Sequence, residues 1–473
     1  RCHNAGLLLG EVPVTVKETR PSRTSIFRRI PRSLRDLIRL KLYLSPALPY
    51  LIFTHTLSLI FLLPSLLLPF SLIDDGYILE HANIATQHLK SAKFSFLPQV
   101  FFESAVGRIR PFYWLFQYAR YLIFGSFAPG FHFINILIIL GIFYFSFVLF
   151  NRILKSSTWS SFGVLAMFFF WRSTENYFRL GPQEPLLLLL LLSSLYFAPS
   201  SISLALVLLA GFTKETAIFI IPFVLPFLFF DINRRKFWLK YFTVASIPLV
   251  SLILIRIFKP TVGDYSDNYQ LMQFVHTWRQ YLTFFDSTWI TSLFKLSLIS
   301  FLFTKIKTKR PALIALWWFI CSFLILLPWK LALGRYLLPV LPGLFLFLIY
   351  QTKKSPKILL PFFIYYWVNF GYTNIIQYHN VLSSYLAREQ ANSQLVRYLS
   401  YQAPTNSNIY FNFSNDPNNL EWLYGSSVHW RYLYDRPDLK PQLVGDALPQ
   451  NGYLLTWNFL APHLTASTPS ATI

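Results

Sequence analysis

The sequence contains little cysteine and few charged residues. Its two cysteines are Cys2, in a basic N-terminal stretch, and Cys321, inside an apolar segment, so no disulfide or cysteine metal site is expected. Charged residues make up only 13% of the 473 residues, whereas 54% are hydrophobic, 19% are aromatic and long Leu, Phe and Ile runs recur. This composition excludes a soluble globular protein and predicts an all-α polytopic membrane protein.

Acidic residues are also scarce: 20 Asp and Glu stand against 42 Lys and Arg, a net charge of +22. In a soluble protein this excess would suggest a nucleic-acid partner, but here much of it lies in short loops between apolar segments, where it sets membrane topology. We therefore expect membrane lipids and no nucleic acid as partners. The basic connectors are Arg152/Lys155, Arg234/Arg235/Lys236/Lys240, Lys305/Lys307/Lys309/Arg310 and Lys353/Lys354/Lys357. They fall on one side if the N-terminus is cytoplasmic, which predicts a plasma-membrane protein with its C-terminus outside.

The apolar runs predict about eleven membrane segments, given that a spanning helix needs roughly 20 residues. They fall near 46–72, 131–150, 158–171, 184–198, 201–213, 215–230, 238–258, 286–304, 311–328, 335–350 and 358–376. The string GFTKET separates two short ones and indicates a broken hairpin. Three parts follow: a basic cytoplasmic segment 1–45, a membrane domain 46–376 and a small extracytoplasmic α/β domain 377–473. In the last part we expect a helix near 383–401 and strands at 408–413 and 453–459.

Two adjacent carboxylates, Asp74 and Asp75, follow the first apolar segment in the string SLIDDGYILEHA. Acids at membrane depth are costly and mark functional candidates. Side by side, like charges raise the pKa of at least one member, which suits a general base. The alternative is a solvated acidic loop.

The residues after the acidic pair predict an amphipathic helix over 77–92. Ile78, Ala82, Ala85 and Leu89 share one face, as in a helix that lies on the outer leaflet. His81 and His88 also share a face, but no third ligand stands at suitable spacing, so polar interfacial residues are favoured over a metal site.

Taken in order, several strings resemble a known family: the acidic pair, then GRIRPFYWLFQY, FGSFAPGFHFINILI, YFRLGPQEPLLLL, GFTKETAIFIIPF and GRYLLPVLPG. The order resembles the GT-C glycosyltransferases, in the branch similar to protein O-mannosyltransferases and lipid A aminoarabinose transferases. The resemblance implies a GT-C-like fold and transfer of a sugar, with inversion, from a polyprenyl-phosphate donor to a glycan, lipid or protein acceptor at the outer face. It implies Asp74 as the base and Asp75 as its neighbour. Protein mannosyltransferases usually have Glu second, so this sequence departs from their pattern.

The chemistry requires cations for the departing phosphate. The candidates for donor phosphate binding are Arg335, Lys214, Arg108 and Arg110, and those for further substrate contacts are Tyr77, Glu184, Arg179 and Glu215. Arg335 is favoured because Arg can hold phosphate bidentately, although it could instead anchor a helix end at the interface. Lys214 and Glu215 could pair with each other, and Glu184 could simply be an acidic helix N-terminus. No cofactor is required by these residues, and a divalent metal is possible but unsupported.

Residues 2–41, CHNAGLLLGEVPVTVKETRPSRTSIFRRIPRSLRDLIRLK, resemble the closing segment of a GT-A-fold polyprenyl-phosphate sugar synthase. The resemblance implies that this chain is the tail of a longer, fused protein. An ordinary basic arm that binds anionic lipid is the alternative.

Two other function classes stay open. A transporter or flippase of lipid-linked sugars should show internal repeats and ionisable residues near mid-helix, whereas here the acids gather at one face. A non-catalytic membrane subunit would need no acidic pair. Loss of sugar transfer on changing Asp74, with folding intact, separates an enzyme from both.

Overall fold

The computed structural model describes most of the chain, with gaps. The described residues are 46–72, 75–90, 109–258, 274–284, 288–303, 310–329, 332–365, 368, 372–413, 419–443, 453–457 and 465–467. The N-terminal segment 1–45, with its resemblance to a sugar synthase, lies outside these ranges. So do Asp74 and Arg108.

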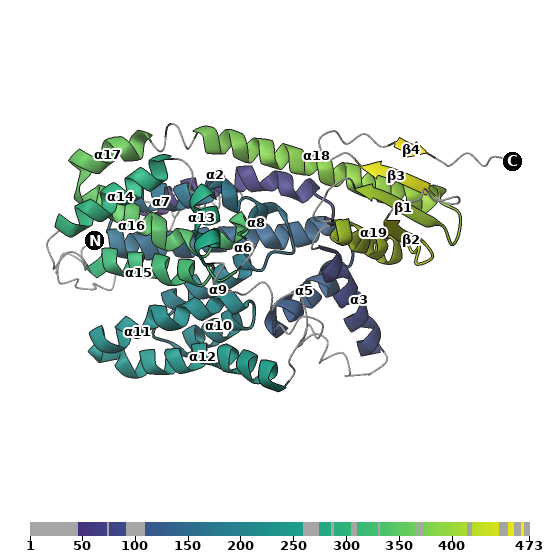
Figure 1. The fold of residues 1–473 in the computed structure, drawn as a ribbon. Coiled ribbons are helices and arrows are strands. Elements are labelled where there is room, and N and C mark those ends of the chain that lie inside the picture. Colours follow the sequence, from purple (N-terminus) through teal and green to yellow (C-terminus); the bar gives the residue numbers. More distant parts are fainter. Residues whose placement is uncertain are drawn as a thin grey trace, which may run out of the picture.

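Helices make up most of the described chain (Figure 1). The α-helices are α2 (Leu48–Leu62), α3 (Asp75–Lys90), α5 (Pro111–Phe124), α6 (Ala128–Leu154), α7 (Ser157–Phe168), α8 (Glu175–Phe178), α9 (Glu184–Tyr196), α10 (Ser201–Gly211), α11 (Ile220–Phe230), α12 (Arg235–Phe258), α13 (Phe274–Phe284), α14 (Thr288–Phe303), α15 (Arg310–Leu324), α16 (Leu341–Lys354), α17 (Pro356–Tyr365), α18 (Tyr372–Gln402) and α19 (Asn419–Leu433). Shorter 3₁₀ helices are η2 (Leu63–Leu67), η4 (Trp171–Ser173), η5 (Glu215–Phe219), η6 (Ile232–Arg234) and η9 (Gly334–Leu337). Every predicted apolar segment contains a helix, and the GFTKET turn between α10 and α11 is confirmed.

Three of the described helical stretches are long and apolar enough to cross a membrane: Leu48–Leu67, Ala128–Leu154 and Ile232–Leu254. Shorter apolar helices of 10–17 residues accompany them. The protein is therefore an integral membrane protein, and the count of about eleven spans stays a prediction.

Helix α6 lies at the centre of the bundle, in contact with α2, α7 and α9. Its 27 residues are almost all apolar, so it can be surrounded by protein and lipid on every side. Fully buried Phe143 of α6 and Phe168 of α7 pack edge to face, with ring centroids 5.2 Å apart. The ring of Tyr378 of α18 lies 5.5 Å from that of Phe168, centroid to centroid, so this aromatic core joins α6 and α7 to α18.

Two of the basic connectors, those after α6 and α16, meet at one end of the bundle. Lys353, at the end of α16, donates a hydrogen bond to the carbonyl of Leu154, the last residue of α6. Ser355 and Ser300 share a hydrogen bond of 2.8 Å, which brings the end of α14 to the same place. Cations beside helix C-termini also complement the helix dipoles.

The predicted segment 358–376 ends inside a helix. Helix α17 covers Pro356–Tyr365, and α18 covers the 31 residues Tyr372–Gln402. The predicted boundary at 376 therefore falls inside a helix, because an apolar stretch and a polar one share a continuous helical backbone.

The predicted helix after the acidic pair is α3, but protein covers its apolar face. Ile78, Ala82 and Ala85 are each at most 2% exposed, and α3 packs on α5 and α19. A face covered in this way is not available to lie in the outer leaflet.

A four-stranded sheet forms at the right-hand end in Figure 1, where α18 leads into it. Its strands are β1 (Asn408–Phe413), β2 (Lys440–Leu443), β3 (Tyr453–Trp457) and β4 (Thr465–Ser467), in the order β2-β1-β3-β4. β1 pairs in parallel with β2 and β3, and β4 is antiparallel to β3. The predicted helix and both predicted strands are thus confirmed. We call the end of α18, the four strands and α19 the C-terminal sheet region.

Candidate functional site

Asp75, the described member of the acidic pair, begins α3 and is only 1% exposed. Its Oδ2 accepts a hydrogen bond from the backbone N–H of Ser71 at 2.8 Å, and its Oδ1 accepts one from the N–H of Gly181 at 3.0 Å. Both bonds favour the ionised carboxylate, as does the N-terminus of α3. Asp75 therefore joins residues 70–72, which we call the turn before α3, to the segment around Gly181 that leads into α9.

A buried arginine that sequence reasoning missed lies near Asp75. Arg120 of α5 is 4% exposed and donates to Gln117 Oε1 at 2.9 Å and to the carbonyl of Phe131. Burial lowers the pKa of Arg120 to about 10, and nearby Tyr113 and Asp75 act in the opposite direction. Arg120 thus partly compensates the buried charge of Asp75.

Glu175 of α8 contacts two of the predicted cationic residues. Its Oε1 lies 2.7 Å from Arg179 Nη1 and 3.1 Å from Arg335 Nη1. Asn176 Nδ2 donates to the backbone carbonyl of Arg335 at 2.9 Å, which holds η9 against α8. Gly334 is required here, because a Cβ on it would stand 2.3 Å from the carbonyl oxygen of Arg172.

Lys214 forms a buried ion pair with Glu184, the first residue of α9. Their side chains are 9% and 2% exposed. The ammonium of Lys214 also lies over the ring of Tyr336, 4.4 Å from its centroid, a favourable cation–π geometry. Glu184 therefore acts as an acidic helix N-terminus, as proposed, and as the counter-ion of Lys214.

Arg110, directly before α5, holds Glu215 of η5 in a bidentate contact. Its Nη2 lies 2.8 Å from Oε2, and its Nε lies 3.1 Å from Oε1. Lys214 and Glu215 therefore each pair with another residue, so the suggestion that they pair with each other is wrong. Their partners lie far away in the sequence and could not be assigned from local spacing.

These contacts form one group, which we call the charge cluster: Arg110, Glu175, Arg179, Glu184, Lys214, Glu215, Arg335 and Tyr336. Tyr336 links its parts, because Lys214 lies over its ring and Arg335 precedes it in the chain. Four basic side chains face three acidic ones, so the cluster keeps an excess of positive charge.

The structure thus brings six predicted site residues together: Arg110, Arg179, Glu184, Lys214, Glu215 and Arg335. Sequence reasoning gave Glu175 no strong role and did not single out Tyr336. Two signals were available: the spacing of Glu175 and Arg179, which suits a helical ion pair, and the position of Tyr336 beside Arg335.

Tyr77 has a different neighbour. Its ring stacks on Tyr424 of α19 with centroids 4.3 Å apart, and the hydroxyl of Tyr424 donates to Glu80. Burial, followed by Glu80, raises the pKa of Tyr424. Tyr77 is 43% exposed, so it presents an aromatic surface where α3 meets the C-terminal sheet region.

No group of three or more His, Cys, Asp or Glu residues suited to a metal ion occurs within the part of the chain that the structure describes. His81 instead packs on Trp114, with ring centroids 4.2 Å apart.

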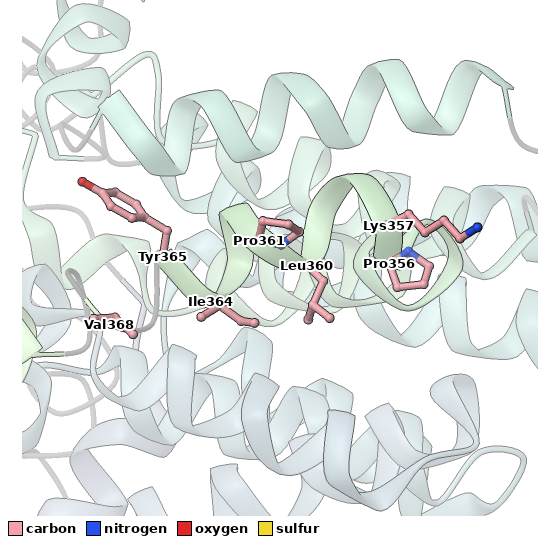
Figure 2. Close-up of a pocket in the computed structure, with 7 residues that line it drawn as sticks. All are labelled: Pro356, Lys357, Leu360, Pro361, Ile364, Tyr365 and Val368. Carbon is pink, nitrogen blue, oxygen red and sulfur yellow. The ribbon is translucent and has the colours of Figure 1, made fainter.

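A groove of about 600 Å³ runs along α17 (Figure 2) and is lined by Pro356, Lys357, Leu360, Pro361, Ile364, Tyr365 and Val368. Figure 1 shows α17 at the end of the bundle opposite the sheet. The groove shares no residue with the charge cluster, so the two are separate features.

The fold and the charge cluster together define a polytopic membrane protein with a polar centre at one end of its helices. No protein-family model matches the chain, and no curated protein sequence matches it. Among solved structures, the crystal structure of ArnT from Cupriavidus metallidurans bound to undecaprenyl phosphate is similar, with a TM-score of 0.50 and 14% sequence identity. The similarity covers 84% of this chain and 86% of that one. The resemblance expected from the sequence motifs is thereby confirmed at the level of the fold.

Proposed function

We propose that this protein is a membrane glycosyltransferase. It moves a sugar, with inversion, from a polyprenyl-phosphate donor to an acceptor at the outer face of the membrane. The observation that carries the proposal is the charge cluster, in which Arg110, Arg179, Lys214 and Arg335 gather beside the segment that binds Asp75. The similar structure named above, which holds undecaprenyl phosphate, supports the donor class.

The reaction needs a base and a stabilised leaving group. A carboxylate, assigned here to Asp74, takes the proton of the acceptor hydroxyl as its oxygen attacks the anomeric carbon. The bond from that carbon to the phosphate oxygen breaks, and the polyprenyl phosphate leaves with the electron pair. Arg335 and Lys214 stabilise the developing phosphate charge, with Arg110 near them. Asp75 binds the backbone of Ser71 and so anchors the segment that precedes the base in the sequence.

The charge cluster also has a purely structural interpretation, since each of its cations already has an acidic partner. Glu175 and Arg335 are 30% and 17% exposed at their side chains, so this pair is the most accessible to a donor phosphate. A phosphate that replaces Glu175 as the partner of Arg335 would offer the two oxygens of the bidentate geometry that guanidinium favours, whereas Glu175 meets Arg335 through Nη1 and Oε1.

The topology completes the proposal. With the basic connectors cytoplasmic, the charge cluster and the C-terminal sheet region face outside, and residues 377–473 act as a small extracytoplasmic domain. The acceptor is a glycan, a lipid or a protein.

The test is transfer from a synthetic polyprenyl-phosphate sugar in detergent, across a pH series. Asp74→Asn keeps size and hydrogen bonding but cannot accept a proton, so the rate should fall about a hundred- to ten-thousand-fold. Asp75→Asn should cost less and lower the optimum pH, because the remaining carboxylate loses a neighbouring negative charge. Near-normal transfer by Asp74→Asn, with unchanged thermal unfolding, would remove the mechanism.

A further inference from the structure

The side chain of Leu72, three residues before Asp75, lies in the hydrophobic core of the C-terminal sheet region. Leu72 is 3% exposed. The other members of this core are Leu395, Val396, Leu399, Ala403, Ile409, Phe411, Trp430 and Leu439. A residue of the turn before α3 is thus part of a core whose other members follow more than three hundred positions later.

Phe70 fixes the other side of the same turn. It is 3% exposed and packs edge to face on Phe131 of α6, with ring centroids 5.1 Å apart. Leu180, next to the Gly181 that binds Asp75, belongs to the same apolar cluster. The turn is therefore held between the membrane helices and the C-terminal sheet region.

The backbone of α19 touches this turn directly. A Cβ on Gly425 would stand 1.9 Å from the carbonyl oxygen of Leu72, closer than atoms can approach. Because that oxygen belongs to the backbone, it cannot rotate away, and the turn or α19 would have to move. Gly76 faces Gly425 across the crossing, but a Cβ there would meet Gly425 Cα at 3.4 Å, an ordinary contact.

A third contact comes from His429, one turn further along α19. It is 1% exposed and lies against the backbone of Ser71, the residue whose N–H binds Asp75. Contacts from α19 thus reach both Ser71 and Leu72, and these residues set the position of the Asp75 carboxylate.

We infer that the C-terminal sheet region positions Asp75, and that Leu72 and Gly425 are the positioning residues that transmit its placement. The effect on sugar transfer rests on the proposed function, whereas the effect on the turn itself does not. Misplacing a catalytic group by about 1 Å can cost on the order of a hundredfold in rate. Small changes at Leu72 or Gly425 should therefore lower kcat and leave the donor KM unchanged.

The experiment compares Leu72→Ala and Gly425→Ala with two controls. Leu72→Met keeps the volume of the side chain and should behave like the parent protein. Val396→Ala opens a cavity in the same core but changes no residue of the turn, so it should lower stability without affecting the placement of Asp75. The rate of sugar transfer per mole of folded protein is measured over a series of donor concentrations, which gives kcat and the donor KM. Amide hydrogen exchange is followed for residues 70–79.

We expect Leu72→Ala and Gly425→Ala to lower kcat about ten- to a hundredfold and to speed exchange at the Ser71 amide, while both controls keep the parent values. The inference is overturned if Leu72→Ala matches Val396→Ala in kcat and in exchange. If Gly425→Ala does not fold, the comparison of Leu72→Ala with Leu72→Met still tests the inference. If the parent protein transfers no sugar, the proposed function fails, and hydrogen exchange alone still tests the positioning.

Discussion

Replacing Lys214 by Met while Glu184 stays in place is expected to destabilise the protein by about 3–5 kcal/mol, because removing one partner leaves a buried charge without its counter-ion. The Glu184 side chain is 2% exposed, so water cannot replace the ammonium. Glu184→Gln alone should cost less, since Lys214 keeps the ring of Tyr336 beneath it. The double variant Lys214→Met/Glu184→Gln should recover most of the stability, because two neutral side chains of similar volume replace the ion pair.

The double variant also separates structure from function. If Lys214 contacts the donor phosphate, losing a charged hydrogen bond worth about 1.5–3 kcal/mol should raise the donor KM roughly ten- to a hundredfold, even though the protein is stable. The assay combines thermal unfolding in detergent with transfer over a donor series for the parent, both single variants and the double variant.

Two results would refute this reasoning. A stable Lys214→Met single variant would mean that the ion pair is not formed in the membrane-embedded protein. A double variant with an unchanged donor KM and kcat would restrict Lys214 to a structural role.

Three further predictions concern other parts of the protein. Arg335→Lys keeps the charge but loses the guanidinium fork, so the donor KM should rise, and an unchanged KM in Arg335→Ala would leave Arg335 as a helix-end anchor bound to Glu175. In a background without the native cysteines, a cysteine at Ser427 should react with an impermeant reagent added outside and one at Thr308 should not, and the reverse pattern would invert the topology. Burial lowers the pKa of His429 to about 4 from 6.5. The unfolded chain therefore binds a proton first as the pH falls, so the free energy of unfolding should decrease by about 1.4 kcal/mol per unit between pH 6.5 and 4, and this slope should be absent in His429→Gln.

The helices could be predicted well because hydropathy is a local property of the sequence. Glu184, for example, was placed at the start of a Leu run, and α9 begins there. The continuation of the helix past 376 could not be predicted, because the composition turns polar there while the helical backbone of α18 runs on to Gln402. The prediction that the apolar face of α3 lies on the outer leaflet was wrong, because the sequence pattern shows that a helix face is apolar and does not show whether lipid or protein covers it.

Six of the eight members of the charge cluster could be named from the motifs, but their pairing could not. Arg110 and Glu215 are 105 positions apart and Arg335 and Glu175 are 160 apart, so only the packing of α5, η5, α8 and η9 brings them together. Gly425 gave no functional signal either. A glycine inside a helical stretch reads as a weak helix former until the backbone that approaches it is known.

The place of Leu72 has a consequence for synthesis of the chain. At roughly 5–20 residues per second, a ribosome needs tens of seconds to pass from Leu72 to Trp430, its partner in the apolar core. Throughout that interval the membrane helices can assemble while Leu72 still lacks its neighbours. The turn before α3 therefore reaches its final position only after the C-terminal sheet region has been made. A prematurely terminated chain would contain the membrane helices without a correctly placed Asp75.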